Sequence, residues 1–131
     1  MEMLFYLGIS ENDIKNMIEI CPDIMYMSEK EIKEKIEILT YIGCNERHIR
    51  NIIVSNPYYL DRFNNDILKL VNYLKEIGIN DIDLLFDSNP YLLNKDDFEI
   101  KEYIQNRKKD GLTLEDIIDE FESNPYIIDE I

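Results

Sequence analysis

Three basic side chains lie close together in the sequence: Arg47, His48 and Arg50. Arginine and protonated histidine can neutralise phosphate oxygens, so this segment is a candidate contact with nucleic acid. The simpler interpretation, an ordinary solvated helix face, is favoured because sequence-independent affinity for nucleic acid takes several more phosphate contacts. A second basic run, at residues 107–109, is interpreted as the end of a helix, where it offsets the helix dipole and is neutralised by the acidic stretch 110–122.

Three tyrosines occupy the same place relative to a proline: Tyr58, Tyr91 and Tyr126 each directly follow one. The residue that follows the remaining proline is Asp23, so we expect this position to be at least partly exposed. A row of aromatic rings along one edge of the molecule could bind a partner. The alternative, which we favour, is that each ring covers the apolar turn beneath it.

No set of residues predicts catalysis, a metal site or a bound cofactor. Cys21, Cys44 and His48 are too few for a structural zinc site, which takes four ligands. No glycine-rich phosphate loop and no nucleophile with a base partner is present. We therefore expect a protein that is not an enzyme, and we interpret both cysteines as small buried or half-buried side chains.

Glycine and proline alternate along the whole chain, and this alternation indicates the structural elements that carry the candidate residues. The four glycines and four prolines lie at 8, 43, 78 and 111 and at 22, 57, 90 and 125. Successive glycines are 35, 35 and 33 residues apart, and successive prolines 35, 33 and 35, because two residues are missing between Gly78 and Pro90. A period of this length indicates a helical repeat array.

Apolar residues follow the same period. Eight residues before each proline stand four isoleucines, at 14, 49, 82 and 117, and we expect all four to be buried at equivalent places. Other apolar residues recur at spacings of four and three, which trace one face of an α-helix. The predicted fold is all-α: an α-solenoid of about four helix-turn-helix repeats of roughly 35 residues.

Each repeat should consist of a helix, a tight turn, a second helix and a short helical turn. Gly43 and Gly78 should have positive φ, because each must end a helix and reverse the chain within about two residues. N-cap residues follow the glycines at positions 10, 45, 80 and 113, and Ser28 with Glu31 predicts a capping box. The repeated Ser-Asn-Pro-Tyr predicts an Asn cap with proline at the first position of a short helical turn.

We predict a single domain, residues 1–131, whose units span about 1–27, 28–62, 63–94 and 95–131, the first of them truncated. The predicted helices cover residues 28–42, 45–56, 64–77, 80–88, 96–109 and 113–123, and residues 126–131 should form a closing turn.

A helix ending in Leu-x-x-(Ile/Leu)-Gly, a capped second helix and Asn-Pro-x-x-Leu, repeated about every 35 residues, resembles the mitochondrial transcription termination factor (mTERF) repeat. The resemblance covers residues 4–25, 32–60, 67–93 and 100–128. It implies a curved stack of helix pairs, each closed by a short Pro-initiated 3-10 turn, which in many members is a cradle for double-stranded nucleic acid.

The charge of the chain disfavours nucleic-acid binding. The chain has a net charge of −14 at pH 7. Residues 1–75 carry 9 basic and 12 acidic side chains, a net of −3, whereas residues 76–131 carry 5 and 16, a net of −11. Such a surface repels duplex DNA.

The favoured function is therefore a non-catalytic binding module that acts as a protein-interaction scaffold. The alternative is a nucleic-acid-binding mTERF-like factor acting in transcription or RNA processes. We expect no membrane partner, because no long apolar run is present. With no recognisable targeting signal and a composition rich in Ile, Asn and Lys, we expect a cytoplasmic, bacterial protein.

Overall fold

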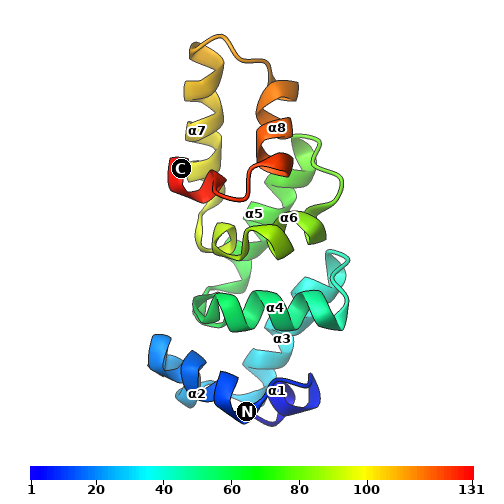
Figure 1. Ribbon diagram of the computed structural model, residues 1–131, viewed down its shortest axis with the longest axis vertical. Helices are drawn as coiled ribbons and strands as arrows, with labels where there is room; N and C mark the ends of the chain where they lie inside the picture. Colours follow the sequence, from blue (N-terminus) through cyan, green and yellow to red (C-terminus); the bar gives the residue numbers. More distant parts are fainter.

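A computed structural model describes all residues, 1–131, and is entirely helical, with no β-strand (Figure 1). Its elements, in chain order, are α1 (Glu2–Tyr6), α2 (Glu11–Ile20), η1 (Pro22–Tyr26), α3 (Glu29–Tyr41), α4 (Glu46–Ser55), η2 (Pro57–Asp61), α5 (Asn64–Glu76), α6 (Ile82–Ser88), η3 (Pro90–Asn94), α7 (Asp97–Lys109), α8 (Leu114–Ser123) and η4 (Ile127–Glu130), where η denotes a 3-10 helix. The order helix, helix, 3-10 turn occurs four times. We call these groups the first to fourth repeats.

Capping residues fix where most second helices begin. The side-chain oxygens of Ser10, Asn45 and Thr113 each accept a hydrogen bond from the backbone N–H three residues on, at 2.8 to 3.1 Å. Thr113 forms a full capping box with Asp116. Ser28 accepts from the Glu31 N–H, but the predicted box is only half formed because Glu31 returns no hydrogen bond.

One predicted cap is wrong. Helix α6 begins at Ile82, with Asp81 rather than Asn80 at its N-cap position, and no side chain caps it. The two residues missing between Gly78 and Pro90 shorten this segment, so that α6 has 7 residues where α2, α4 and α8 have 10.

The tight turns between helices depend on glycine. Gly43 and Gly78 have φ of +104° and +106°, which confirms the prediction. In the first of these turns the Gly43 N–H donates to Thr40 O at 3.1 Å and the Cys44 N–H to Leu39 O at 3.0 Å. These bonds satisfy carbonyls at the end of α3 while the chain reverses, which a residue with a Cβ atom would do only under strain.

The 3-10 turns begin at a proline in the first three repeats, whereas η4 begins at Ile127, two residues after Pro125. The Asn caps predicted before these prolines are only partly correct. Asn56 and Asn89 hold the N-cap position, but neither side chain makes a capping hydrogen bond. The Asn124 side chain accepts from Tyr126 N–H at 2.9 Å.

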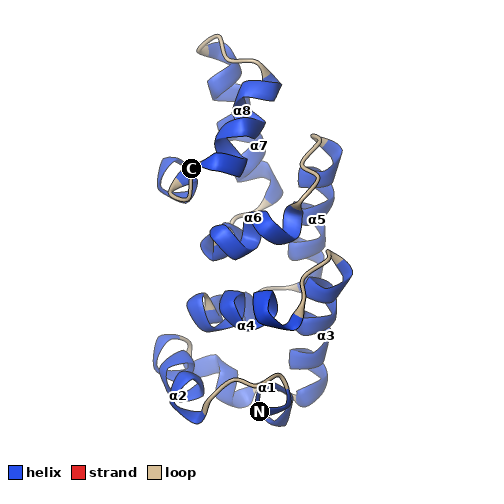
Figure 2. Ribbon diagram, turned by 45° about the vertical axis from the view of Figure 1, so that its right-hand side comes forward, coloured by secondary structure: helices blue, strands red, loops and turns tan.

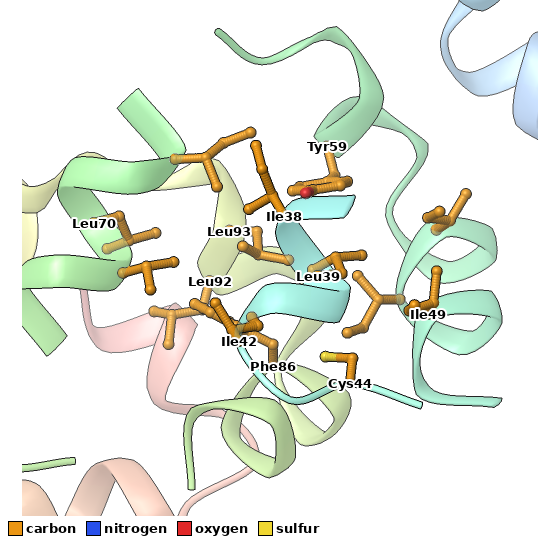
Figure 3. Close-up of a cluster of buried hydrophobic side chains, with 14 of the residues drawn as sticks. Ile38, Leu39, Ile42, Cys44, Ile49, Tyr59, Leu70, Phe86, Leu92 and Leu93 are labelled. Carbon is orange, nitrogen blue, oxygen red and sulfur yellow. The ribbon is translucent and has the colours of Figure 1, made fainter. Parts of the chain in front are cut away.

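One continuous core of 32 buried residues runs through the stack. The four isoleucines at 14, 49, 82 and 117 are all buried in it, as predicted. Figure 3 shows how helix α3 and turn η3 contribute to one part of this core, where Leu39 and Ile42 lie near Leu92 and Leu93. The apolar position three residues after each proline is less uniform, since Leu60 and Leu93 are buried but Met25 is exposed.

Equivalent elements stack on one another along the molecule. First helices contact first helices (α1 with α3, α3 with α5, α5 with α7), second helices contact second helices (α2 with α4, α4 with α6), and η2 packs between η1 and η3 (Figure 2). The fourth repeat departs from this pattern: in Figure 1, α4 and α6 lie across the long axis, whereas α8 runs along it beside α7. None of the helices is both long and apolar enough to span a membrane.

Candidate binding site

The basic segment of α4 does not form one surface. Arg47 and Arg50, three positions apart, lie on one face of α4, whereas His48 points to another. Arg47 is exposed. The Arg50 Nη1 atom donates to the Leu7 carbonyl at 3.1 Å, and the His48 Nδ1 atom faces the Asp83 carboxylate at 4.0 Å. Two of the three candidate phosphate contacts therefore face neighbouring repeats.

The other two arginines are also engaged within the chain. Arg62 donates to Asn94 O at 2.8 Å, to Lys95 O at 3.3 Å and to Asp96 Oδ1 at 3.0 Å. Arg107 donates to Glu120 Oε1 at 2.9 Å, and this hydrogen bond raises the pKa of the guanidinium. The acidic stretch thus neutralises Arg107, as the sequence indicated. Of the four arginines, only Arg47 makes no hydrogen bond or ion pair.

The candidate tyrosines are partly exposed, as expected from their register. The exposed fractions are 47% for Tyr58, 49% for Tyr91 and 71% for Tyr126. The neighbouring Tyr59 is fully buried instead, and its hydroxyl donates to Lys35 O at 2.7 Å. Tyr91 and Tyr126 line one cavity together, which Tyr58 does not line.

That cavity lies where the third and fourth repeats meet, and Asn51 and Ser55 of α4 in the second repeat also line it. It has a volume of about 450 Å³ and shares the lining residue Ser88 with a second cavity of about 170 Å³ between α6 and α8. We call the two together the 3–4 cleft. Its lining residues are Asn51, Ser55, Asp81, Leu84, Leu85, Asp87, Ser88, Asn89, Pro90, Tyr91, Glu122, Pro125, Tyr126, Ile128 and Asp129.

The 3–4 cleft is acidic. Four carboxylates line it, and no lysine, arginine or histidine does. The carboxylates are Asp81, Asp87, Glu122 and Asp129. Asn51 fixes the orientation of Asp87 by donating to its Oδ1 atom at 2.8 Å. A cation in the cleft would meet only negative charge.

Side-chain hydrogen bonds that the 3–4 cleft lacks close the equivalent junction between the second and third repeats. There the Asn56 amide nitrogen donates to Pro90 O and to Asn94 Oδ1, both at 2.9 Å, and Asn56 Oδ1 accepts from the Asn94 amide at 3.1 Å. The equivalent Asn89 is 4% exposed, and its Oδ1 atom is buried with no hydrogen-bond partner. The fourth repeat is therefore not bridged to the third as the third is to the second.

The sequence analysis did not predict this cleft, because the segments at 55–58 and at 88–91 are both Ser-Asn-Pro-Tyr and give no sign that the two junctions differ. The available signal was the short interval between Gly78 and Pro90, which shortens α6 on one wall of the cleft.

The buried cysteines are free thiols. Burial raises the pKa of Cys44 to about 12 and also raises the pKa of Cys21. A thiol with a raised pKa carries little thiolate at neutral pH and is a poor nucleophile. No group of three or more His, Cys, Asp or Glu side chains is placed to hold a metal ion.

Comparison with protein-family models identifies the repeats. The mTERF family model matches residues 1–40 and 25–129, which together cover nearly the whole chain. The chain belongs to the mTERF family. Its helix pairs and 3-10 turns are therefore mTERF repeats, and the 3–4 cleft is a gap between two of them. Comparison with curated proteins gives no match.

Proposed function

We propose that this chain is a non-catalytic mTERF-repeat module that binds a protein partner. One observation carries the proposal: in a chain of net charge −14, three of the four arginines are engaged in contacts within the molecule. Nucleic-acid binding depends on several cations that are free to neutralise phosphates. Protein partners impose no such requirement, and partly exposed tyrosines are typical contact residues in protein interfaces.

A second candidate, nucleic-acid binding, is favoured by membership of the mTERF family. Among the candidate residues of α4, Arg47 is in this case best placed to contact a phosphate, because it is exposed and its side chain makes no hydrogen bond or ion pair. A binder with so few phosphate contacts would have a shallow dependence of affinity on salt and a weak affinity.

The test begins with an anisotropy titration of random duplex DNA and duplex RNA at about 0.15 M salt, with the full chain. We expect no binding tighter than about 10 μM, a range typical of non-specific binders. Arg47→Glu is the informative variant. Arg50→Glu would break the hydrogen bond to Leu7 O, and a loss of binding would then have two explanations. Tight binding that Arg47→Glu abolishes would support the second candidate and overturn the first.

The second part seeks the protein partner directly. The tagged chain is cross-linked in its native host, with and without nuclease treatment, and the captured proteins are identified. The proposal predicts a partner whose capture survives nuclease treatment. Capture that depends on intact nucleic acid would contradict it.

A further inference from the structure

We propose that the 3–4 cleft binds an extended protein segment that carries lysine or arginine side chains. This inference rests on the proposed function, since it names the place and the chemistry of the protein partner. Charge complementarity is the first argument. Four carboxylates and no basic side chain line the cleft, so a cationic segment is attracted and a phosphate is repelled.

The second argument is the unpaired amide of Asn89. A buried polar atom without a hydrogen-bond partner destabilises the folded chain, so such atoms are rare. The Asn89 Oδ1 atom is one, and Asn89 lines the cleft. At the equivalent position the Asn56 Oδ1 atom accepts from the Asn94 amide. An N–H of an inserted segment would supply the donor that Asn89 lacks.

The third argument is the apolar and aromatic part of the lining. Tyr91 and Tyr126 border the larger cavity, and Leu84, which is 50% exposed, borders the smaller one. Aromatic rings attract the ammonium and guanidinium groups of lysine and arginine, and Leu84 offers a surface to their aliphatic stems. A combined volume of several hundred Å³ holds a few side chains of a peptide but not a folded domain.

The probe is a fluorescein-labelled nonapeptide that alternates lysine and leucine, with a glutamate–leucine peptide as its counterpart. Binding to the full chain is measured by anisotropy at about 0.05 M and about 0.15 M salt. The proposal predicts that the lysine peptide binds, more tightly at the lower salt, and that the glutamate peptide does not.

Matched double variants localise the binding. Asp87→Asn with Asp129→Asn removes two charges from the cleft and keeps an acceptor for the Asn51 amide. Glu19→Gln with Glu76→Gln removes two charges from exposed positions outside the 3–4 cleft. We expect the cleft variant to bind the lysine peptide about tenfold more weakly and the control to bind within about twofold of the native chain. Circular dichroism and thermal melting establish that both variants fold.

A second readout follows Asn89 itself. In ¹H–¹⁵N spectra the lysine peptide should shift the side-chain amide resonances of Asn89, while those of Asn56 stay in place. Equal loss of affinity in both double variants, or no binding by the native chain, would overturn the cleft assignment. So would a self-association that the cleft variant abolishes, since the occupant would then be a second copy of this chain.

These failures differ from failure of the proposed function. A partner captured by cross-linking whose capture is unchanged in the Asp87→Asn, Asp129→Asn variant would overturn the cleft and leave a protein-binding module. Tight binding of nucleic acid through Arg47 would overturn the proposed function itself.

Discussion

The junctions on either side of the third repeat are built from similar residues but differ in how they are closed. Between the second and third repeats, Asn56 and Arg62 connect η2 to η3 and to the start of α7 through six hydrogen bonds. Between the third and fourth repeats, the equivalent Asn89 and Lys95 side chains make none, and the 3–4 cleft lies there instead. A repeat array can therefore leave a cleft at one junction by omitting its polar bridges, here together with a shortened second helix, α6.

We expect the largest loss of stability when a core side chain of the second repeat is truncated. Ile49 is buried in α4, and truncation to alanine removes apolar contacts and leaves a cavity (Figure 3). We expect Ile49→Ala to lower the free energy of unfolding by about 2 to 5 kcal/mol, measured by urea denaturation. Leu84→Ala is the matched change in the cleft, where the side chain is half exposed, and it should cost about 1 kcal/mol or less. Equal losses would mean that the cleft is packed as tightly as the core.

The next largest effect should come from the bridging asparagine. Asn56→Ala removes the hydrogen bonds to Pro90 O and to Asn94 and leaves these partly buried groups without their partner. We expect a loss of about 2 to 3 kcal/mol in the free energy of unfolding.

Asn89→Ala is the matched control, because its amide makes no hydrogen bond to lose. It should change the free energy of unfolding by about 1 kcal/mol or less, and removal of an unpaired buried oxygen could even stabilise the chain. A cost for Asn89→Ala as large as that for Asn56→Ala would contradict the difference between the two junctions.

Arg62 gives a third comparison. Its guanidinium donates to two backbone carbonyls and to Asp96, so Arg62→Ala should lower the free energy of unfolding by about 1 to 2 kcal/mol. Lys95 stands at the same distance after its proline and makes no side-chain contact of this kind, so Lys95→Ala should cost about 0.5 kcal/mol or less. A double-mutant cycle of Arg62→Ala with Asp96→Ala would show a coupling energy if the ion pair contributes, and none if the carbonyl contacts suffice.

Most of the fold follows from a few residue types in the sequence. The spacing of glycine and proline predicts the repeats, because Gly43 and Gly78 need the left-handed conformation and proline begins the first three 3-10 turns. The buried face follows from the helical period, with Ile49 and its equivalents in the core. These features depend on residues close in sequence, so a local pattern is enough.

The candidate site depends on contacts between repeats, which the local pattern does not contain. Asn56 and Asn89 stand in identical Ser-Asn-Pro-Tyr segments, yet only Asn56 reaches the next turn. Arg47 and Arg50 look alike in the sequence, but only Arg50 reaches a carbonyl of the preceding repeat. The orientation of each repeat against its neighbour decides these contacts, and it depends on the whole interface.

The smallest expected effect on stability is electrostatic and lies at the junction between the first and second repeats. Partial desolvation raises the pKa of Asp61 at the end of η2, although the residue is largely exposed, and the neighbouring carboxyl group of Asp23 in η1 raises it further. A carboxyl group whose pKa is higher in the folded than in the unfolded chain binds more protons when folded. Its contribution to stability is therefore lost as pH rises from near its ordinary pKa of 3.8 through the raised value.

Replacement of Asp61 by asparagine should remove this dependence, because the amide is neutral at every pH and can still donate to Asp23. We expect Asp61→Asn to be more stable than the native chain at pH 7, and the difference should shrink as pH falls toward about 4, where Asp61 becomes protonated. Urea denaturation at several pH values measures it. Glu19→Gln, on the exposed side of α2, controls for the loss of one negative charge. If both variants gain the same stability at pH 7, the gain comes from the lower net charge of the chain, which is −14 in the native protein. Repulsion between Asp23 and Asp61 would then make no separate contribution to the stability of this junction.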